Sequence, residues 1–194
     1  MSLFEFTFGL SAVILGLALT HLASSFHRLA IAGSRVRWAP EPVLLSGIIF
    51  LVIVSVWLFQ WQVREQTETT IGLMLLQVLK LLLPFLAAAF VLPEQVPDEG
   101  PLDLYAHYDR TRAFTYGALI AGLLLFWIHA LVMGSMRPGG LQGDLLTIIK
   151  RGPWMFVALY ASLIFVRARW FNILILGGGF LGYLWDIAGV KLQI

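Results

Sequence analysis

The sequence predicts an all-α bundle of about six transmembrane helices, in a single domain of residues 1–194, and two observations lead to this prediction. Hydrophobic residues make up 59% of the chain and charged residues only 12%, against roughly a quarter charged in soluble domains. Six apolar stretches follow one another, and most approach the ~20 residues that a helix needs to cross the hydrocarbon core. They lie at residues 6–30, 42–62, 70–92, 113–133, 153–167 and 170–190.

The first three stretches meet the length requirement for a spanning helix. Residues 6–30 exceed the apolar region of a cleaved signal peptide, and Glu5 stands where such a peptide carries basic residues, so we expect a retained helix. Residues 42–62 and 70–92 are nearly uninterrupted in hydrophobicity. Pro84 lies inside the third stretch, where it should kink the helix and free a backbone carbonyl near Lys80.

The last three stretches are less uniform. Residues 103–108 are expected to lead helically into the fourth span at 113–133. The fifth, 153–167, covers only about 22 Å as a helix, so two arrangements stay open: a short span or a partly re-entrant segment.

In the sixth stretch, Gly177 to Gly182 match the dinucleotide-binding motif G-x-G-x-x-G. That motif requires a preceding strand in a βαβ unit, whereas these glycines lie in a predicted membrane helix, so we reject a dinucleotide site. We interpret Gly178 and Gly182 as a small-residue packing pair, like Gly117/Ala121 and Ala118/Gly122.

Pairs of arginines mark three connections that a six-helix chain places on one membrane face. They are Arg35 and Arg37, Arg110 and Arg112, and Arg167 and Arg169. With Arg28, this face holds seven of the thirteen Lys and Arg residues. The positive-inside rule then places these connections in the cytoplasm and both termini outside, with the six arginines near lipid headgroups.

Ionisable groups inside hydrocarbon are costly, so each is a candidate functional residue. Lys80 lies near the middle of the third span, and Gln77 lies one turn before it on the same face. His21 lies slightly past the middle of the first span. The sequence therefore suggests a proton or ion path through Lys80 and His21, with a snorkelling or neutral lysine as the alternative.

A second group lies roughly 9–12 Å toward the opposite face from the arginine pairs, on three helices that run parallel to one another. It consists of His129, Asp186 and Gln60. These side chains could form an outer vestibule in which Asp186 sets the tautomer of His129. An interfacial belt, with each group touching water or headgroups, is the alternative.

No motif indicates catalysis. The chain has no cysteine, which excludes thiolate metal sites and thiol catalysis, and it lacks a zinc motif. We therefore expect no metal and no catalytic residues. A membrane enzyme that acts on lipid would rest only on Asp186 and His129, and it ranks last among the hypotheses. A haem between His21 and His129 is disfavoured by their different depths, although it stays open as an alternative. The net charge of +2 gives no reason to expect nucleic acid as a partner.

Several short motifs resemble a group of small bacterial integral membrane proteins of unassigned function. They are Phe4-Glu5-Phe6, the run from Gly16 to Leu22 with Arg28-Leu29, Arg35-Val36-Arg37 and Ala106-His107-Tyr108, within the first 125 residues or so. The resemblance implies a bacterial inner membrane and brings no activity with it.

Three functions follow as hypotheses. The first is an oligomeric six-helix bundle that conducts or binds a proton or small ion. The second is a ligand-binding or accessory subunit of a larger membrane complex, or a homo-oligomer that packs through its small-residue faces. The third is a protein that binds haem or lipid within the bilayer.

Overall fold

The structure, a computed structural model, describes residues 3–60, 70–97, 100–136 and 145–189, and most of them are helical. The predicted all-α bundle is confirmed. The helices are α1 (Leu3–Ala32), α2 (Pro40–Gln60), α3 (Ile71–Val91), α4 (Leu104–Ser135), α5 (Leu145–Lys150), α6 (Trp154–Phe165) and α7 (Arg169–Gly189).

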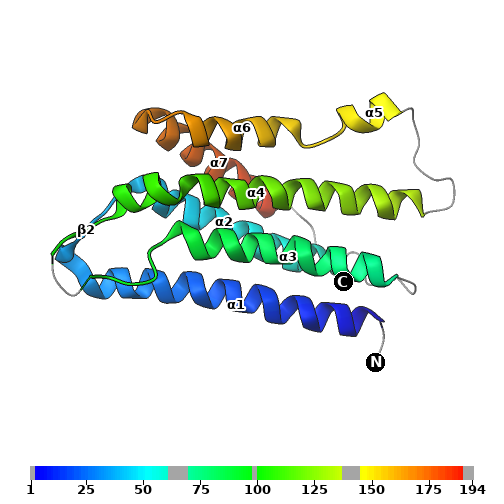
Figure 1. Ribbon diagram of the computed structural model, residues 1–194, viewed down its shortest axis with the longest axis horizontal. Helices are drawn as coiled ribbons and strands as arrows, with labels where there is room; N and C mark the ends of the chain where they lie inside the picture. The colour runs from blue at the N-terminus through cyan, green and yellow to red at the C-terminus, as the bar shows by residue number, and fades with distance from the viewer. Residues whose placement is uncertain (1–2, 61–69, 98–99, 137–144, 190–194) are drawn as a thin grey trace.

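The long helices lie side by side along the long axis of the molecule (Figure 1). Helix α3 packs against both α1 and α4, and α2 packs against α1, α3 and α7. Helix α6 covers α4. The bundle therefore has α1, α2, α3 and α4 in contact with two or more long neighbours each, whereas α6 and α7 lie at its periphery.

Five of the described helices, α1, α2, α3, α4 and α7, are long and apolar enough to cross a membrane. Each 21-residue helix is about 30 Å long, close to the thickness of the hydrocarbon core. Helix α6 occupies the predicted fifth stretch, but it has only 12 residues, about 18 Å. A full crossing by α6 stays a prediction, and so do the six spans.

Helix α4 begins at Leu104, although the predicted span begins at residue 113. The Asp103 side chain caps it by accepting a hydrogen bond of 2.9 Å from the Ala106 backbone N–H. The polar residues that follow are thus helical, as expected for 103–108. The apolar run alone begins only at residue 113, because hydropathy detects the membrane-buried part of a helix and not its extension beyond the bilayer.

Two short strands tie together connections that are far apart in the sequence. Strand β1 (Val36–Arg37) follows the 3₁₀ turn η1 (Gly33–Arg35), and it pairs in parallel with β2 (Leu102–Asp103). Nearby, Arg35 donates a hydrogen bond of 3.3 Å to the Pro97 carbonyl. The α1–α2 and α3–α4 connections are therefore joined at one end of the bundle.

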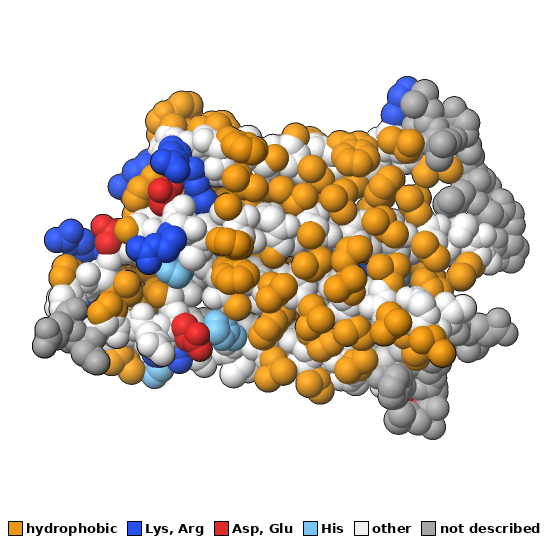
Figure 2. Space-filling view, in the orientation of Figure 1, with side chains coloured by type: hydrophobic (Ala, Val, Ile, Leu, Met, Phe, Trp, Pro, Cys, Tyr) orange, Lys and Arg blue, Asp and Glu red, His pale blue; other side chains and the backbone are white. Residues whose placement is uncertain are grey.

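The α6–α7 connection lies at this same end, so the three arginine pairs share one face, as predicted (Figure 1). Figure 2 shows that most charged side chains visible on this face of the molecule gather there, while hydrophobic side chains cover the rest. We call this region the charged end. Which side of a membrane it occupies stays a prediction.

Small residues let α3 and α4 approach closely. A Cβ added at Gly122 would lie 3.4 Å from the Leu83 Cβ and 3.9 Å from the Pro84 Cδ. Of the small-residue pairs predicted to pack, Ala118 and Gly122 are both buried. By contrast, Gly117, Gly178 and Gly182 have open space where a Cβ would lie, so within the described chain these three glycines are not in tight interfaces.

Candidate functional site

Lys80 faces the interior of the bundle. Its residue is only 7% exposed, and its Nζ lies 3.2 Å from Nδ1 of His129 on α4. The same nitrogen lies 4.9 Å from the centroid of the Phe126 ring. The lysine therefore has an imidazole and an aromatic face as neighbours, rather than acyl chains.

The close contact between α3 and α4 explains this geometry. Gly122 packs against the turn of α3 that contains Pro84, and Pro84 follows Lys80 by one helical turn. Proline has no N–H, so the Lys80 carbonyl lacks its helical donor. His129 lies about two turns beyond Gly122 on the same helix, where the lysine stem can reach it.

The pair can exchange a proton. An ammonium can donate to Nδ1 of a neutral imidazole, which then carries its proton on Nε2. Two positive charges at 3.2 Å would repel strongly in a low-dielectric interior, and no described carboxylate contacts either group. The pair is thus suited to hold one positive charge or none.

His21 and Gln77 occupy the opposite side of α3, toward α1. The His21 ring lies 6.5 Å from the ring of Phe85, and its Nε2 is buried without a hydrogen-bond partner. Gln77 lines a cavity of about 20 Å³ together with Thr7 and Ser11, which suffices for about one water molecule. In the described chain no hydrogen bond joins either residue to Lys80, so a path through Lys80 and His21 stays a prediction.

Among the described residues no hydrogen bond or ion pair joins the members of the predicted outer group. Asp186 is exposed on α7. Gln60 is 8% exposed, and its Nε2 has no hydrogen-bond partner in the described chain. His129 has Lys80 as its hydrogen-bond partner, and the outer vestibule stays a prediction.

Three of the six predicted headgroup arginines, Arg35, Arg112 and Arg169, have partners within the protein. All six are exposed except Arg112. Arg35 contacts the Pro97 carbonyl, as described above. Arg112 is buried, with Asp109 at 3.4 Å and the Val166 carbonyl at 3.5 Å.

Arg169 forms the best-defined ion pair of the described chain. Its Nε and Nη2 donate to the two carboxylate oxygens of Glu41, at 2.8 Å and 3.3 Å. The Glu41 side chain is 0% exposed, whereas that of Arg169 is 53% exposed. The guanidinium also stacks over Tyr105, at 4.3 Å from its centroid. Sequence reasoning missed Glu41, because its partner lies 128 residues away.

A chain of buried tyrosines leads from the charged end into the bundle. The Tyr108 and Tyr116 hydroxyls are hydrogen-bonded at 3.1 Å, and the Tyr116 ring stacks on that of Tyr160, with centroids 6.0 Å apart. Tyr160 belongs to α6, so this stacking helps to fix α6 against α4.

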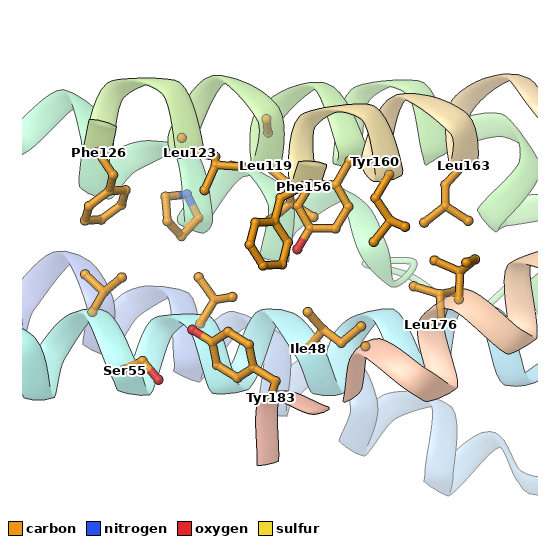
Figure 3. Close-up of a pocket in the computed structure, with 18 of the residues that line it drawn as sticks. Ile48, Ser55, Leu119, Leu123, Phe126, Phe156, Tyr160, Leu163, Leu176 and Tyr183 are labelled. Carbon is orange, nitrogen blue, oxygen red and sulfur yellow. The ribbon is translucent and has the colours of Figure 1, made fainter. Parts of the chain in front are cut away.

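Beyond Tyr160 lies a partly open cavity of about 360 Å³, enclosed by α2, α4, α6 and α7. Figure 3 shows four of its aromatic side chains, Phe126, Phe156, Tyr160 and Tyr183, in the space between these helices. Its other walls are Phe59, aliphatic side chains, small residues and Pro84. None of the described residues that line the cavity is charged. We call it the apolar cavity.

The apolar cavity and the Lys80 site are adjacent. Phe126 lines the cavity and also lies under the Lys80 ammonium. Sequence reasoning missed the cavity, since it requires knowing which faces of four helices meet. The only signal in the sequence was the row of small residues, Ala118 and Gly122 on α4 and Gly179 on α7, which all line it.

Metal and haem ligation receive no support from the arrangement of side chains. Among the described residues, no group of three or more His, Asp or Glu side chains is placed to hold a metal ion. His21 and His129 contact different residues of α3, on the sides facing α1 and α4. Haem binding stays an untested prediction.

No protein-family model matches the sequence, and no curated protein or solved structure matches it either. Function must therefore be argued from the geometry of the chain itself.

Proposed function

We propose that this protein binds an apolar membrane compound, such as a lipid with a long hydrocarbon skeleton, in the apolar cavity. The observation that supports this proposal is the volume of about 360 Å³ with its uncharged lining. Ligand sites in proteins measure roughly 300–1,000 Å³ and are lined mostly by hydrophobic and aromatic side chains with a few polar groups.

The position of the cavity favours a ligand that comes from the bilayer. Its walls belong to the apolar parts of α2, α4 and α7, which are long enough to span a membrane. Its outer wall includes the short helix α6, which lies at the periphery of the bundle. A compound dissolved in the membrane could therefore enter sideways without crossing the charged end.

The driving force for such binding differs from that of a soluble pocket. A ligand that moves from lipid into the cavity leaves one apolar environment for another, so little hydrophobic free energy is gained. Affinity must then come from shape complementarity, aromatic contacts and hydrogen bonds. We accordingly expect selectivity among membrane compounds rather than general uptake of acyl chains.

Photolabelling with a matched pair of variants tests the proposal. Gly179 lines the cavity, and only Ile48 lies near its missing side chain. Gly179→Leu should fill the space. Gly182→Leu is the control, because it makes the same change on the same helix where nothing lies within 4 Å.

The probe is a diazirine derivative of hexadecane, added to purified protein in nanodiscs and mapped by mass spectrometry. We expect labels on the cavity-lining residues of α4, α6 and α7, reduced several-fold in Gly179→Leu and unchanged in Gly182→Leu. Labels confined to the outer surface, or equal labelling in both variants, would contradict the proposal.

A second candidate function, passage of a proton or small ion, is favoured by the contact between Lys80 and His129. Reconstituted protein should then carry H⁺ flux above that of empty liposomes between about pH 5 and 8, and Lys80→Met should abolish it. Wild-type flux equal to that of empty liposomes would remove this candidate and leave the first untouched.

A further inference from the structure

We propose that the hydroxyl groups of Tyr160 and Tyr183 recognise a carbonyl oxygen of the compound in the apolar cavity. The ligand would then be a neutral ketone-, quinone- or ester-type lipid and not a plain hydrocarbon. This inference rests on the proposed function, because it names the chemical class of the same ligand.

The two phenols come from different helices and meet in one space. Tyr160 belongs to α6 and Tyr183 to α7, and both line the cavity. Figure 3 shows their hydroxyl groups in the gap between the helices. Both side chains face the same cavity (Figure 3), so a compound that fills it would contact both.

The Tyr160 hydroxyl has an unused donor. Its ring stacks on Tyr116, but in the described part of the chain no side chain or backbone group accepts a hydrogen bond from it. Ser55 of α2 also lines the cavity, and its Oγ has no hydrogen-bond partner among the described residues, so the phenol proton of Tyr183 is not held by it. Both tyrosines therefore offer a donor to the cavity.

A carbonyl oxygen fits this pair of donors. It has two lone pairs and no proton of its own, so it can accept one hydrogen bond from each phenol. A hydroxyl group left without a partner in an apolar environment loses the interaction that water would provide. Binding a carbonyl would satisfy both groups at once.

The absence of charge from the described lining argues against an ionised head group. A carboxylate or phosphate would enter a region with no cation among its described walls, and burying an unpaired charge is strongly unfavourable. Lys80 is not among the described lining residues, and its Nζ is engaged with His129. A neutral carbonyl is thus the better match.

The test compares two probes of equal length, 9-heptadecanone labelled with ¹³C at its carbonyl and heptadecane. Binding to protein in nanodiscs is measured by competition with the hexadecane diazirine probe. We expect the ketone to compete better than the alkane by roughly threefold to tenfold, the range that one or two net hydrogen bonds provide. Tyr160→Phe and Tyr183→Phe should each reduce this preference.

Infrared spectroscopy distinguishes a lost hydrogen bond from a general change in protein structure, because it measures the stretching frequency of the ligand carbonyl itself. Hydrogen bonding lowers the stretching frequency of the bound ¹³C=O group, and each Phe variant should shift it back toward the free value. Tyr105→Phe is the matched control, since Tyr105 stacks under Arg169 at the charged end and should leave the spectrum unchanged.

The two proposals fail in distinguishable ways. Equal competition by ketone and alkane, with Gly179→Leu still blocking both, would overturn the carbonyl inference and keep the cavity as a binding site. A carbonyl band that is lowered but insensitive to both Phe variants would mean that water or another group holds the oxygen, which also overturns it. No binding of either probe would remove the proposed function itself.

Discussion

The side-chain nitrogen of Lys80 lies 3.2 Å from Nδ1 of His129, although 49 residues separate the two in the sequence. The contact joins the middle of α3 to the last third of α4. It explains how a lysine is accommodated at the depth of the hydrocarbon core, because the charged group is turned toward protein and not toward lipid. The pair also adjoins the apolar cavity, through Phe126.

Replacing Lys80 by methionine should not unfold the protein. Methionine has a similar volume and removes a buried charge that no carboxylate of the described residues compensates, so we expect the free energy of unfolding to be unchanged or raised by about 1 kcal/mol. Unfolding in detergent measures this, with the exposed Lys150→Met as control. A loss of more than about 2 kcal/mol would show that the Lys80–His129 contact itself stabilises the fold.

Breaking the Glu41–Arg169 ion pair should, in contrast, lower the free energy of unfolding. Arg169→Met leaves a fully buried carboxylate without a partner, and because Arg169 is half-exposed we expect a cost of about 2 kcal/mol, below that of a fully buried pair. The double variant with Glu41→Gln should recover part of this loss. The exposed neighbour Arg167→Met should cost less than about 0.5 kcal/mol. Equal losses of unfolding free energy in Arg169→Met and Arg167→Met would contradict the ion pair.

The packing of α3 on α4 can be tested with two glycines on the same helix. Gly122→Leu must push against Leu83 and Pro84, and we expect it to lower the free energy of unfolding by about 1–3 kcal/mol. Gly117→Leu enters open space and should have little effect. A larger loss of unfolding free energy in Gly117→Leu than in Gly122→Leu would show that α4 presents a different face to α3.

The absence of cysteine makes orientation testable by accessibility. Arg167→Cys lies at the charged end and Ser135→Cys at the other end, and both positions are exposed. If the positive-inside rule holds, a membrane-impermeant maleimide applied to intact cells labels the cysteine at 135 and spares the one at 167. The reverse pattern would place the charged end outside.

The sequence sufficed to predict the helices, because spanning length and hydrophobicity are local properties. It also predicted that the arginine pairs share one end, since consecutive spans must alternate in direction. The helical lead into α4 at residues 103–108 was expected too, although the apolar run begins only at residue 113, because the first turns of α4 are polar.

The contacts within the site could not be predicted in the same way. The long helices are apolar on most of their faces, so periodicity does not show which face meets which neighbour. Depth along the axis grouped His129 with Asp186, but the structure turns His129 toward Lys80 and leaves Asp186 exposed. Glu41 and Arg169, or Tyr160 and Tyr183, meet only once the whole bundle is assembled.

The measurement that tests the central claim most directly is an experimental density map of the protein in lipid nanodiscs. If the apolar cavity is a binding site, elongated density that is not protein should fill the space between α2, α4, α6 and α7 and reach the hydroxyls of Tyr160 and Tyr183. Gly179→Leu should lack this density. Helices α6 and α7 closed against α2 and α4, with no density between them in the wild type, would contradict the claim.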